Sequence, residues 1–367
     1  MVNVTQLCFA GFAVLGATAC AGRQNAADEL IPVAKAVTIY SAGGSVVSGV
    51  IDPAAVGARR LRLPATVSAI TLSQGDQSVK WFTVQAVPET KKDQTHKLIG
   101  LPGLSPGELK FNYGLPDITW ALQLKADIVD AKSVNLTLLA VVNMNANEPY
   151  KNCDVTLVLN NAVSVEKLAG STFRLSSFDL DPHRNITYKL GNKTADYSFI
   201  REWNADSDKD EVHVLLQAKN PFSVDLSQTS SSVDANDIIV EAGTISSQSA
   251  PGELVSLPAG IDDTISTFRS VKITEATDKR PLPFNHHISY SIINRSDQRK
   301  MLRLVTSRVM GNEHRSVYHF TEAPDATPEN TLVWMLTLEP GATRTLEFNF
   351  DADVKDVEGE NGFEQGG

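Results

Sequence analysis

The sequence predicts an all-β protein: tandem antiparallel β-sandwich domains of the immunoglobulin type, preceded by a small N-terminal β region. Short β-branched and aromatic runs alternate with clusters of Gly, Pro, Asn and Asp along the chain, as in sandwiches and barrels. The sequence after residue 27 lacks the sustained i, i+3, i+4, i+7 apolar repeat of amphipathic helices. The 17 prolines and 23 glycines mostly fall between the apolar runs, where turns are expected.

The N-terminal β region is predicted over residues 33–100, followed by a linker at 102–107 that contains two Pro-Gly pairs. The whole protein has 367 residues, more than a typical single domain of about 100–150 residues, so two or three domains are expected. The strands expected in this region are 37–40, 45–51, 67–72 and 79–87.

The second region spans residues 109–350, and a division into two subdomains near 227–285 is left open. The serine-rich run 227–237 predicts a loop or a long strand connection. The acidic tail, 351–367, is predicted to be disordered. The strands expected before the C-terminal part are 111–113, 120–124, 134–142, 155–159, 186–190 and 212–217.

The C-terminal part of this region suggests two hairpins. Residues 332–338 and 346–350 each alternate apolar and polar side chains, and residues 339–342 between them read Glu-Pro-Gly-Ala. Proline at the second position and glycine at the third are typical of a type II turn. Likewise, residues 288–292 are expected to pair with 301–310 across an Asn-Arg-Ser-Asp turn.

Residues 1–27 resemble a bacterial leader. The segment 7–22 carries no charge and is rich in small and apolar residues, a length too short for a comfortable membrane span but typical of a signal peptide. Small residues directly precede Cys20, as in a lipobox, so we predict that Cys20 is acylated at the mature N-terminus. The alternative is a buried N-terminal helix. The only membrane association expected is through this lipid anchor.

Cleavage at Cys20 would leave Cys153 as the one unacylated cysteine, so no disulfide is expected in the mature chain. Cys153 follows a polar pair and precedes a strand-like run, which favours a small buried hydrophobe over a reactive thiol. The formal net charge of -10 would repel phosphate backbones, so nucleic acid is not expected as a partner.

Motif searches for catalytic chemistry and cofactors give no candidate. Ser45 follows two glycines but lacks the second glycine of a nucleophile elbow and the helix after it, so a turn leading into a strand is expected. The sequence contains no phosphate-binding loop and no dinucleotide fingerprint. We therefore predict neither catalytic residues nor a cofactor. A carboxylate pair assembled in three dimensions stays open as the alternative.

Histidine spacing predicts no metal site. His286 and His287 are adjacent, so a strand would direct them to opposite faces. His314 and His319 are five residues apart, which also separates them in a strand. We expect these histidines to be exposed. The carboxylates of residues 179 and 181 lack the further ligands of a calcium loop, so 179–183 is expected to be a turn.

Trp203 is expected to lie nearest the surface of the four tryptophans, because a charged stretch follows it at 206–211. Packing in the fold is favoured for Trp203 over a role in stacking on a ligand.

Three spaced runs stand out in the second region: 118–124, which reads ITWALQL, 136–143, and 149–157, which reads PYKNCDVTL. Further pieces follow at 215–220, 243–257, 288–294 and 332–350, the last with a Leu-x-Pro-Gly turn. Together these motifs resemble the family called domain of unknown function 4139, which includes mucoidy-inhibitor-A-like bacterial proteins. The resemblance implies β-sandwich architecture and an envelope context. The family has no established catalytic residues to carry over.

The sequence therefore predicts a non-enzymatic exported envelope protein, periplasmic or anchored in the outer membrane of a bacterium. Its β-sandwich modules would bind another envelope protein or a surface polymer, or serve a structural role. The alternative is an enzyme that acts on cell-envelope or capsular carbohydrate through an unrecognised carboxylate pair.

Overall fold

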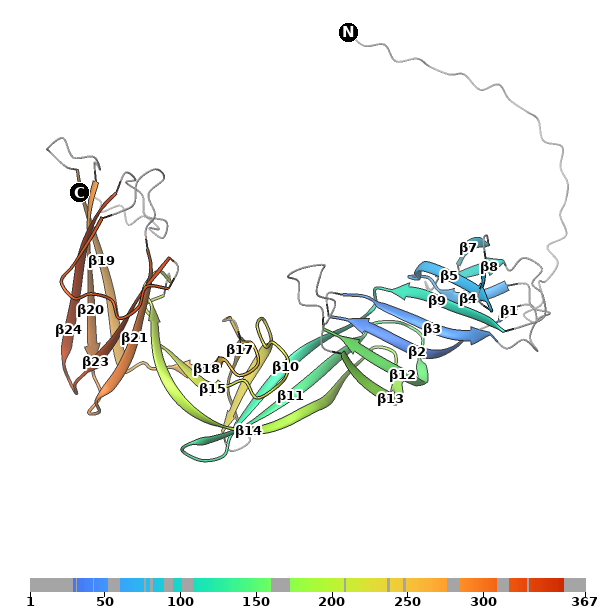
Figure 1. The fold of residues 1–367 in the computed structure, drawn as a ribbon, viewed down its shortest axis with the longest axis horizontal. Helices are drawn as coiled ribbons and strands as arrows, with labels where there is room; N and C mark the ends of the chain where they lie inside the picture. The colour runs from blue at the N-terminus through green and yellow to red at the C-terminus, as the bar shows by residue number, and fades with distance from the viewer. Residues whose placement is uncertain are drawn as a thin grey trace, which may run out of the picture. The chain divides into compact units, whose positions relative to one another are not determined.

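The computed structural model consists of β-strands joined by turns and loops (Figure 1). It describes residues 29–30, 32–41, 43–51, 60–75, 77–79, 82–88, 95–100, 108–159, 172–207, 209–235, 238–246, 249–275, 284–308, 317–328 and 330–352. These ranges contain strands and no helix, which confirms the all-β class, and hence no helix in them could cross a membrane. The predicted leader with Cys20, the linker at 102–107 and the tail after residue 352 lie outside the described residues.

The chain divides into two compact units, one of residues 1–35 and 47–114 and the other of residues 36–46 and 115–367. In the first unit, β1, β4, β8 and β7 form one sheet in that order, and β9 pairs with β5, which pairs with β6. Its strands are β1 (Glu29–Leu30), most of β3 (Ser45–Ile51), β4 (Arg60–Pro64), β5 (Ser68–Gln74), β6 (Gln77–Ser78), β7 (Thr83–Pro88), β8 (Thr95–Gly100) and nearly all of β9 (Leu109–Leu115).

Strand β4 was not predicted, although its sequence, Arg-Leu-Arg-Leu-Pro, alternates charged and apolar residues. Its two leucines, Leu61 and Leu63, are fully buried, as is Ile99 of β8. In β3, Gly49 permits a close approach: a Cβ there would lie 2.5 Å from the ring of Phe111. A side chain at this position would displace the Phe111 ring.

The second unit contains the remaining strands, with β2 from Ala36 onward. Its sheets have the orders β13-β12-β2, β17-β16-β10-β11-β14-β15-β18 and β19-β20-β24-β22, with β21 joining β14 to β23. The strands are β2 (Val33–Tyr40), β10 (Ile118–Ile128), β11 (Ser133–Met144), β12 (Tyr150–Val158), β13 (Thr172–Leu180), β14 (Arg184–Asn204), β15 (His213–Lys219), β16 (Ser230–Ala235), β17 (Ile238–Thr244), β18 (Leu254–Ile261), β19 (Ile265–Glu275), β20 (Phe284–Asn294), β21 (Lys300–Ser307), β22 (Val317–Phe320), β23 (Thr331–Leu338) and β24 (Thr343–Ala352).

The prediction of a loop or a long strand connection at 227–237 was wrong, because this segment contains strand β16. β16 pairs in parallel with β10 and antiparallel with β17, so its backbone groups are used in ladders on both sides. Ser231, Ser232 and Asp234 are buried, and Asp234 lies 2.8 Å from the Lys125 ammonium of β10. Polar residues therefore occupy an interior strand here, where composition alone indicates a loop.

Strand β14 is 21 residues long and takes part in successive pairings. It pairs with β11 over 184–196, then with β15 over 197–202, and with β21 over 201–204. The ladder with β11 shifts register between Leu138 and Leu139, and such a bulge bends a strand. The last residues of β14 consequently belong to a different core from the first ones.

The two predicted C-terminal hairpins were wrong in their pairing. β23 pairs with β21, whereas β24 pairs with β20 and β22, so the strands on either side of the 339–342 turn belong to different sheets. Strands β20 and β21 are likewise in different sheets, although they follow one another in sequence. Alternation of apolar and polar residues specifies which face of a strand is buried. It does not specify whether the next strand is hydrogen-bonded alongside or packs against that face from the opposite sheet.

The turn itself is confirmed. Gly341 has a φ of +66°, and the Ala342 N–H donates to the Glu339 carbonyl at 3.1 Å. Glycine accepts this left-handed conformation without a Cβ clash. The turn thus carries the chain from one sheet to the other as an arch.

Between these sheets lies an aromatic core, to which β20 and β24 contribute from one side and β14, β21 and β23 from the other. The Trp334 ring lies 5.8 Å from Phe348, and Trp203 meets Tyr290 edge-on at 5.4 Å. Offset and edge-to-face contacts at these distances stabilise aromatic pairs. The buried members are Trp203, Ala205, Val212, Ile265, Ile288, Tyr290, Ile292, Leu302, Leu304, Leu332, Trp334, Leu336, Leu338, Leu346, Phe348 and Phe350.

Candidate functional site

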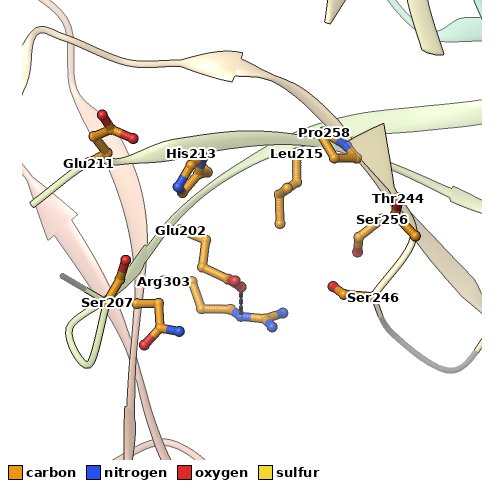
Figure 2. Close-up of a pocket in the computed structure, with 11 residues that line it drawn as sticks. Glu202, Ser207, Glu211, His213, Leu215, Thr244, Ser246, Ser256, Pro258 and Arg303 are labelled. Atoms are coloured by element: carbon orange, nitrogen blue, oxygen red, sulfur yellow. Dashed lines mark ion pairs between the residues drawn. The ribbon is translucent and has the colours of Figure 1, made fainter. Parts of the chain in front are cut away.

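A polar cavity of about 300 Å³ lies on the outer face of β14, on the side away from the aromatic core (Figure 2). Strands β14, β15, β18 and β21 and the end of β17 contribute its walls. Its volume is at the lower end of the range for small-molecule sites. The lining residues are Glu202, Asn204, Ser207, Glu211, His213, Leu215, Thr244, Ser246, Ser256, Pro258 and Arg303.

The strand registers place five side chains in one row across this face. Met335 of β23 is paired with Arg303, Arg303 with Glu202, Glu202 with His213, and His213 with Ile261. Residues directly opposite one another in neighbouring strands point to the same face. The row therefore has charged and polar groups at its centre and exposed apolar side chains at both ends, with Met335 39% and Ile261 53% exposed.

At the centre of the row, Glu202 and Arg303 form an ion pair. Glu202 Oε2 lies 2.8 Å from Arg303 Nε, and the two side chains are 23% and 35% exposed. The geometry is that of a charge contact without an aligned hydrogen bond, and neither atom has a hydrogen-bond partner among the described residues. Both atoms are themselves buried, so this ion pair is shielded from solvent.

The alternation of β14 connects this wall to the core behind it. Glu202 and Asn204 face the cavity, whereas Arg201 and Trp203 face the other way, as expected for successive residues of a strand. Trp203 is fully buried against Tyr290, so the prediction that it lies near the surface was wrong. The charged residues that follow it lie beyond the end of the strand, while Trp203 is the penultimate residue of β14 and points into the core.

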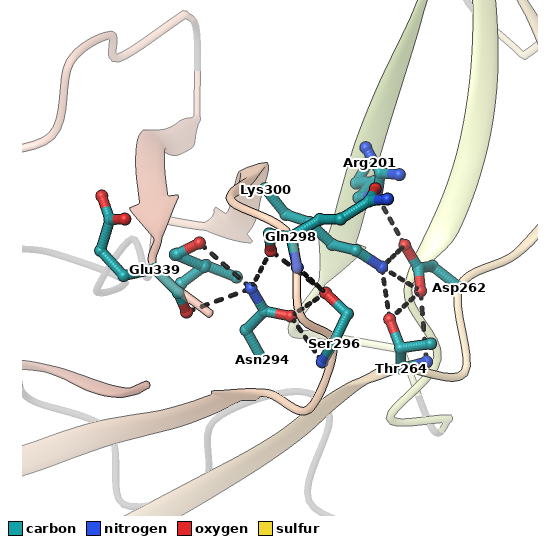
Figure 3. Close-up of polar contacts among 9 residues, drawn as sticks. Arg201, Asp262, Thr264, Asn294, Ser296, Gln298, Lys300 and Glu339 are labelled. Atoms are coloured by element: carbon teal, nitrogen blue, oxygen red, sulfur yellow. Dashed lines mark hydrogen bonds and ion pairs between the residues drawn. The ribbon is translucent and has the colours of Figure 1, made fainter. Parts of the chain in front are cut away.

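A buried ion cluster holds Arg201, which lies on the face of β14 opposite the cavity (Figure 3). Lys300 Nζ lies 2.9 Å and 2.7 Å from the two Asp262 oxygens, and Arg201 Nε lies 2.5 Å from Asp262 Oδ2. Lys300 Nζ also donates to the Thr264 hydroxyl. Burial raises the pKa of Asp262, but the hydrogen bonds from Lys300, Thr264 and Arg201 outweigh it and hold that pKa well below its ordinary value.

Asn294 forms a second buried network beside this cluster (Figure 3). Its Nδ2 donates to the carbonyls of Gln298, Leu338 and Glu339 at 2.8, 3.1 and 3.1 Å, and its Oδ1 accepts from the Ser296 N–H and hydroxyl. One side chain thus holds together the turn after β20 and the start of the 339–342 arch. The cavity wall is therefore supported by satisfied polar groups, which favours a fixed binding geometry.

The cavity presents hydrogen-bonding groups of every kind. Carboxylates accept, the Arg303 guanidinium donates, and the hydroxyls of Ser207, Thr244, Ser246 and Ser256 can do either. Gln217 Nε2 donates to Ser256 Oγ at 2.9 Å and so orients that hydroxyl. Within the ranges that the structure describes, no group of three or more His, Cys, Asp or Glu residues could hold a metal ion. The arrangement suits reversible binding of a polar group.

Three of the histidines considered for metal binding fall in described strands. His286 is fully buried and stacks on Phe350 at 4.6 Å, so the prediction of an exposed side chain was wrong for it. His287 points to the opposite face, as predicted, with its Nδ1 2.6 Å from Asn349 Oδ1. His319 on β22 is exposed, and His314 lies outside the described residues.

The other residues singled out from the sequence are buried in the fold or paired with neighbouring side chains. Cys153 is buried, as predicted. Ser45 is buried, and its hydroxyl donates to the Leu115 carbonyl at 3.2 Å. Asp179 is the penultimate residue of β13, and the turn that follows it places Asp181 within 2.5 Å of Lys151 Nζ. None of these residues lines the cavity.

Sequence reasoning missed the cavity, because its walls come from strands that are distant in the chain. One signal was present. The Arg-Glu-Trp-Asn run at 201–204 places polar side chains alternately with a tryptophan, which in a strand directs the polar side chains away from the core.

The chain matches no protein-family model and no curated protein. The resemblance to the domain of unknown function 4139 family therefore stays a prediction.

Proposed function

We propose that this chain is a non-enzymatic, exported envelope protein whose tandem immunoglobulin-like sandwiches bind a partner molecule through the cavity on β14. The observation that carries the proposal is the cavity itself, in which Glu202 and Arg303 lie side by side on a rigid sheet face. Binding sites combine a concave shape with a few fixed polar groups, and this surface has both.

The support behind the cavity strengthens the proposal. Arg201 and Trp203, the neighbours of Glu202 in sequence, are held by Asp262 and Tyr290. Side chains on a strand fixed in this way keep their positions without a ligand, which lowers the entropy cost of binding.

The experiment is affinity capture from an envelope extract of the bacterium, with the mature chain immobilised. Arg303→Ala removes the guanidinium from the cavity, and Arg299→Ala is the matched control, because Arg299 is 68% exposed and pairs with Glu339 outside the lining. We expect one ligand to be recovered by the parent chain and by the Arg299 variant, and about tenfold less by the Arg303 variant. Equal recovery by both variants would contradict the proposal.

Export is tested separately on the chain purified from its own cells. Acylation at Cys20 predicts a mature chain that begins at that residue and carries lipid mass, and Cys20→Ala should abolish the lipid addition. Recovery of the parent chain with an unprocessed Met1 would contradict export.

An enzyme acting on envelope carbohydrate is the second candidate, because two carboxylates, Glu202 and Glu211, line the same cavity. Glycoside hydrolysis requires a pair of carboxyl groups that flank the bond to be cleaved. Incubation of the chain with the captured ligand, followed by mass spectrometry, separates the candidates. Cleavage that is lost in Glu211→Gln would establish the enzyme, whereas an unchanged ligand would support the binding function.

A further inference from the structure

We propose that the cavity on β14 recognises an amino-sugar residue of a cell-surface glycan, with Glu211 as the partner of its amino group. The inference rests on the proposed binding function and adds the chemical class of the ligand. It follows from the charge balance, the hydrogen-bonding groups and the apolar part of the lining.

The charge balance excludes acidic ligands. The lining contains two carboxylates, one guanidinium and the imidazole of His213. Arg303 is engaged with Glu202 at 2.8 Å, while Glu211 has no ion-pair partner among the described residues. The Glu211 carboxylate is therefore an unpaired negative charge in the lining, which repels phosphate and uronate groups and attracts a cation.

The hydrogen-bonding groups match sugar hydroxyls. A hydroxyl both donates and accepts, so it is best satisfied by a wall that offers both functions at close range. Here Glu202 accepts, Arg303 donates, and Ser246 and Ser256 do either. A hydrophobic ligand would leave these groups unpaired, at a cost for each group.

The apolar contribution is small and aliphatic. Leu215 and Pro258 are the apolar residues of the lining, which contains the His213 imidazole but no Phe, Tyr or Trp. This surface suits the C–H face of one pyranose ring, whereas extended stacking of a longer chain would need aromatic platforms. Figure 2 shows Glu211 at the opposite end of the lining from Pro258, Ser246 and Ser256, so the amino sugar at Glu211 and the next sugar unit of the glycan would occupy the cavity together.

The test is isothermal titration of the intact chain with three oligosaccharides of equal length: a glucosamine tetramer, an N-acetylglucosamine tetramer and a galacturonic acid tetramer. The two glucosamine probes differ in the charge and size of one nitrogen substituent. We expect the glucosamine tetramer to bind about tenfold more tightly than its acetylated form, as one charge-assisted hydrogen bond provides. We expect no binding of the acidic tetramer.

Glu211→Gln is the decisive variant, because it removes the charge and keeps the shape. It should abolish the preference for the free amine, so that both glucosamine probes bind with similar affinity. Glu241→Gln on β17 is the matched control outside the lining and should keep the preference. A thermal unfolding midpoint equal to that of the parent chain would show that each variant is folded.

Tightest binding of the acidic tetramer, or an unchanged preference in Glu211→Gln, would overturn the inference. Absence of binding for all three probes would overturn it as well. If envelope capture that depends on Arg303 then recovers a protein, the proposed binding function stands and the ligand class is peptide. If capture is also independent of Arg303, both proposals fail.

Discussion

Two regions of the second unit bury alternate side chains of their strands, but the buried side chains are of different kinds. The core between β20, β24, β21 and β23 is aromatic, with Trp203, Trp334, Tyr290 and Phe348 in mutual contact. The buried side chains of β10 and β11 are mostly aliphatic, and Trp120 is their one aromatic ring. Their burial patterns are otherwise alike, with alternate residues inside.

The ion pairs of the two regions also differ, in how far their side chains are exposed to solvent. Asp262 and Lys300 at the edge of the aromatic core are both 8% exposed. In the pair beside β10, Asp234 is 5% exposed, but its partner Lys125 is 35% exposed. A buried charge that loses its partner cannot recruit water, but a half-exposed one can. We infer that the aromatic region tolerates substitution poorly, and that this rigidity keeps the adjoining cavity in shape.

The largest expected effect is from Trp334→Ala. The substitution removes a fully buried ring and its 3.0 Å hydrogen bond to the Glu322 carbonyl, so we expect a loss of about 4 kcal/mol in the free energy of unfolding. Urea unfolding followed by tryptophan fluorescence and circular dichroism measures it. Met335→Ala, at the exposed neighbouring position, is the control and should cost less than about 0.5 kcal/mol. Similar losses in both would show that the Trp334 ring is not packed as described.

Asp262→Asn should be the next largest, with a loss of about 3 kcal/mol at neutral pH, because it leaves Lys300 and Arg201 without their carboxylate. Asp263→Asn is the control, since Asp263 is exposed, and it should be close to neutral. Chemical denaturation of the three proteins at pH 7 gives the comparison. A stable Asp262→Asn variant would remove the distinction between the two regions.

The same carboxylate predicts a pH dependence. The pKa of Asp262 is lower in the folded chain than its ordinary 3.8, so its contribution is complete well above that value and is lost as pH falls through it toward the folded pKa. Unfolding free energy measured from pH 6 to about pH 3 should therefore fall more steeply in the parent chain than in Asp262→Asn. Parallel curves would show that Asp262 does not govern acid sensitivity.

Gly341→Ala should cost about 1 kcal/mol, because an alanine at φ +66° is strained even though a Cβ would meet no atom within 4 Å. The effect tests the arch between the two sheets of the aromatic core. Gly252→Ala is a matched control with φ +83° and equal space around it, in a turn that precedes β18. If only Gly341→Ala exposed the core to a fluorescent hydrophobic probe, the arch would be shown to align the sheets.

The smallest effect is expected from Asp234→Asn beside β10, at about 0.5 kcal/mol, because the half-exposed Lys125 keeps Asp127 at 2.7 Å as a partner. Salt titration of stability checks the reason: the difference between parent and variant should shrink as ionic strength rises. A loss equal to that of Asp262→Asn would mean that the two ion pairs are equivalent.

The sequence predicts the elements of this fold better than their pairing. Apolar alternation at 332–338 and 346–350 located β23 and β24, and the Pro-Gly pair located the turn. Alternation has the same period whether the next strand is hydrogen-bonded alongside or lies across the core, so the arch was read as a hairpin. β16 was missed because its serines are buried by tertiary contacts that composition does not reveal.

The cavity was unpredictable for a related reason. Glu202, His213, Ser256 and Arg303 are brought together by the registers of β14 with β15 and β21 and of β15 with β18. Those registers depend on the bulges and on which core each strand joins, and neither is encoded in a local motif. Trp203 shows the limit most clearly, because its charged neighbours in sequence indicated a surface position for a fully buried ring.

The central claim is that the β14 cavity is where this protein meets its ligand, and photo-crosslinking tests it most directly. A photoreactive amino acid would replace His213, an exposed residue that lines the cavity, or His319, an exposed residue on β22 outside it. After irradiation in intact cells, we predict a discrete covalent adduct from position 213 and none from position 319. Adducts from position 319 alone, or equally from both positions, would contradict the claim.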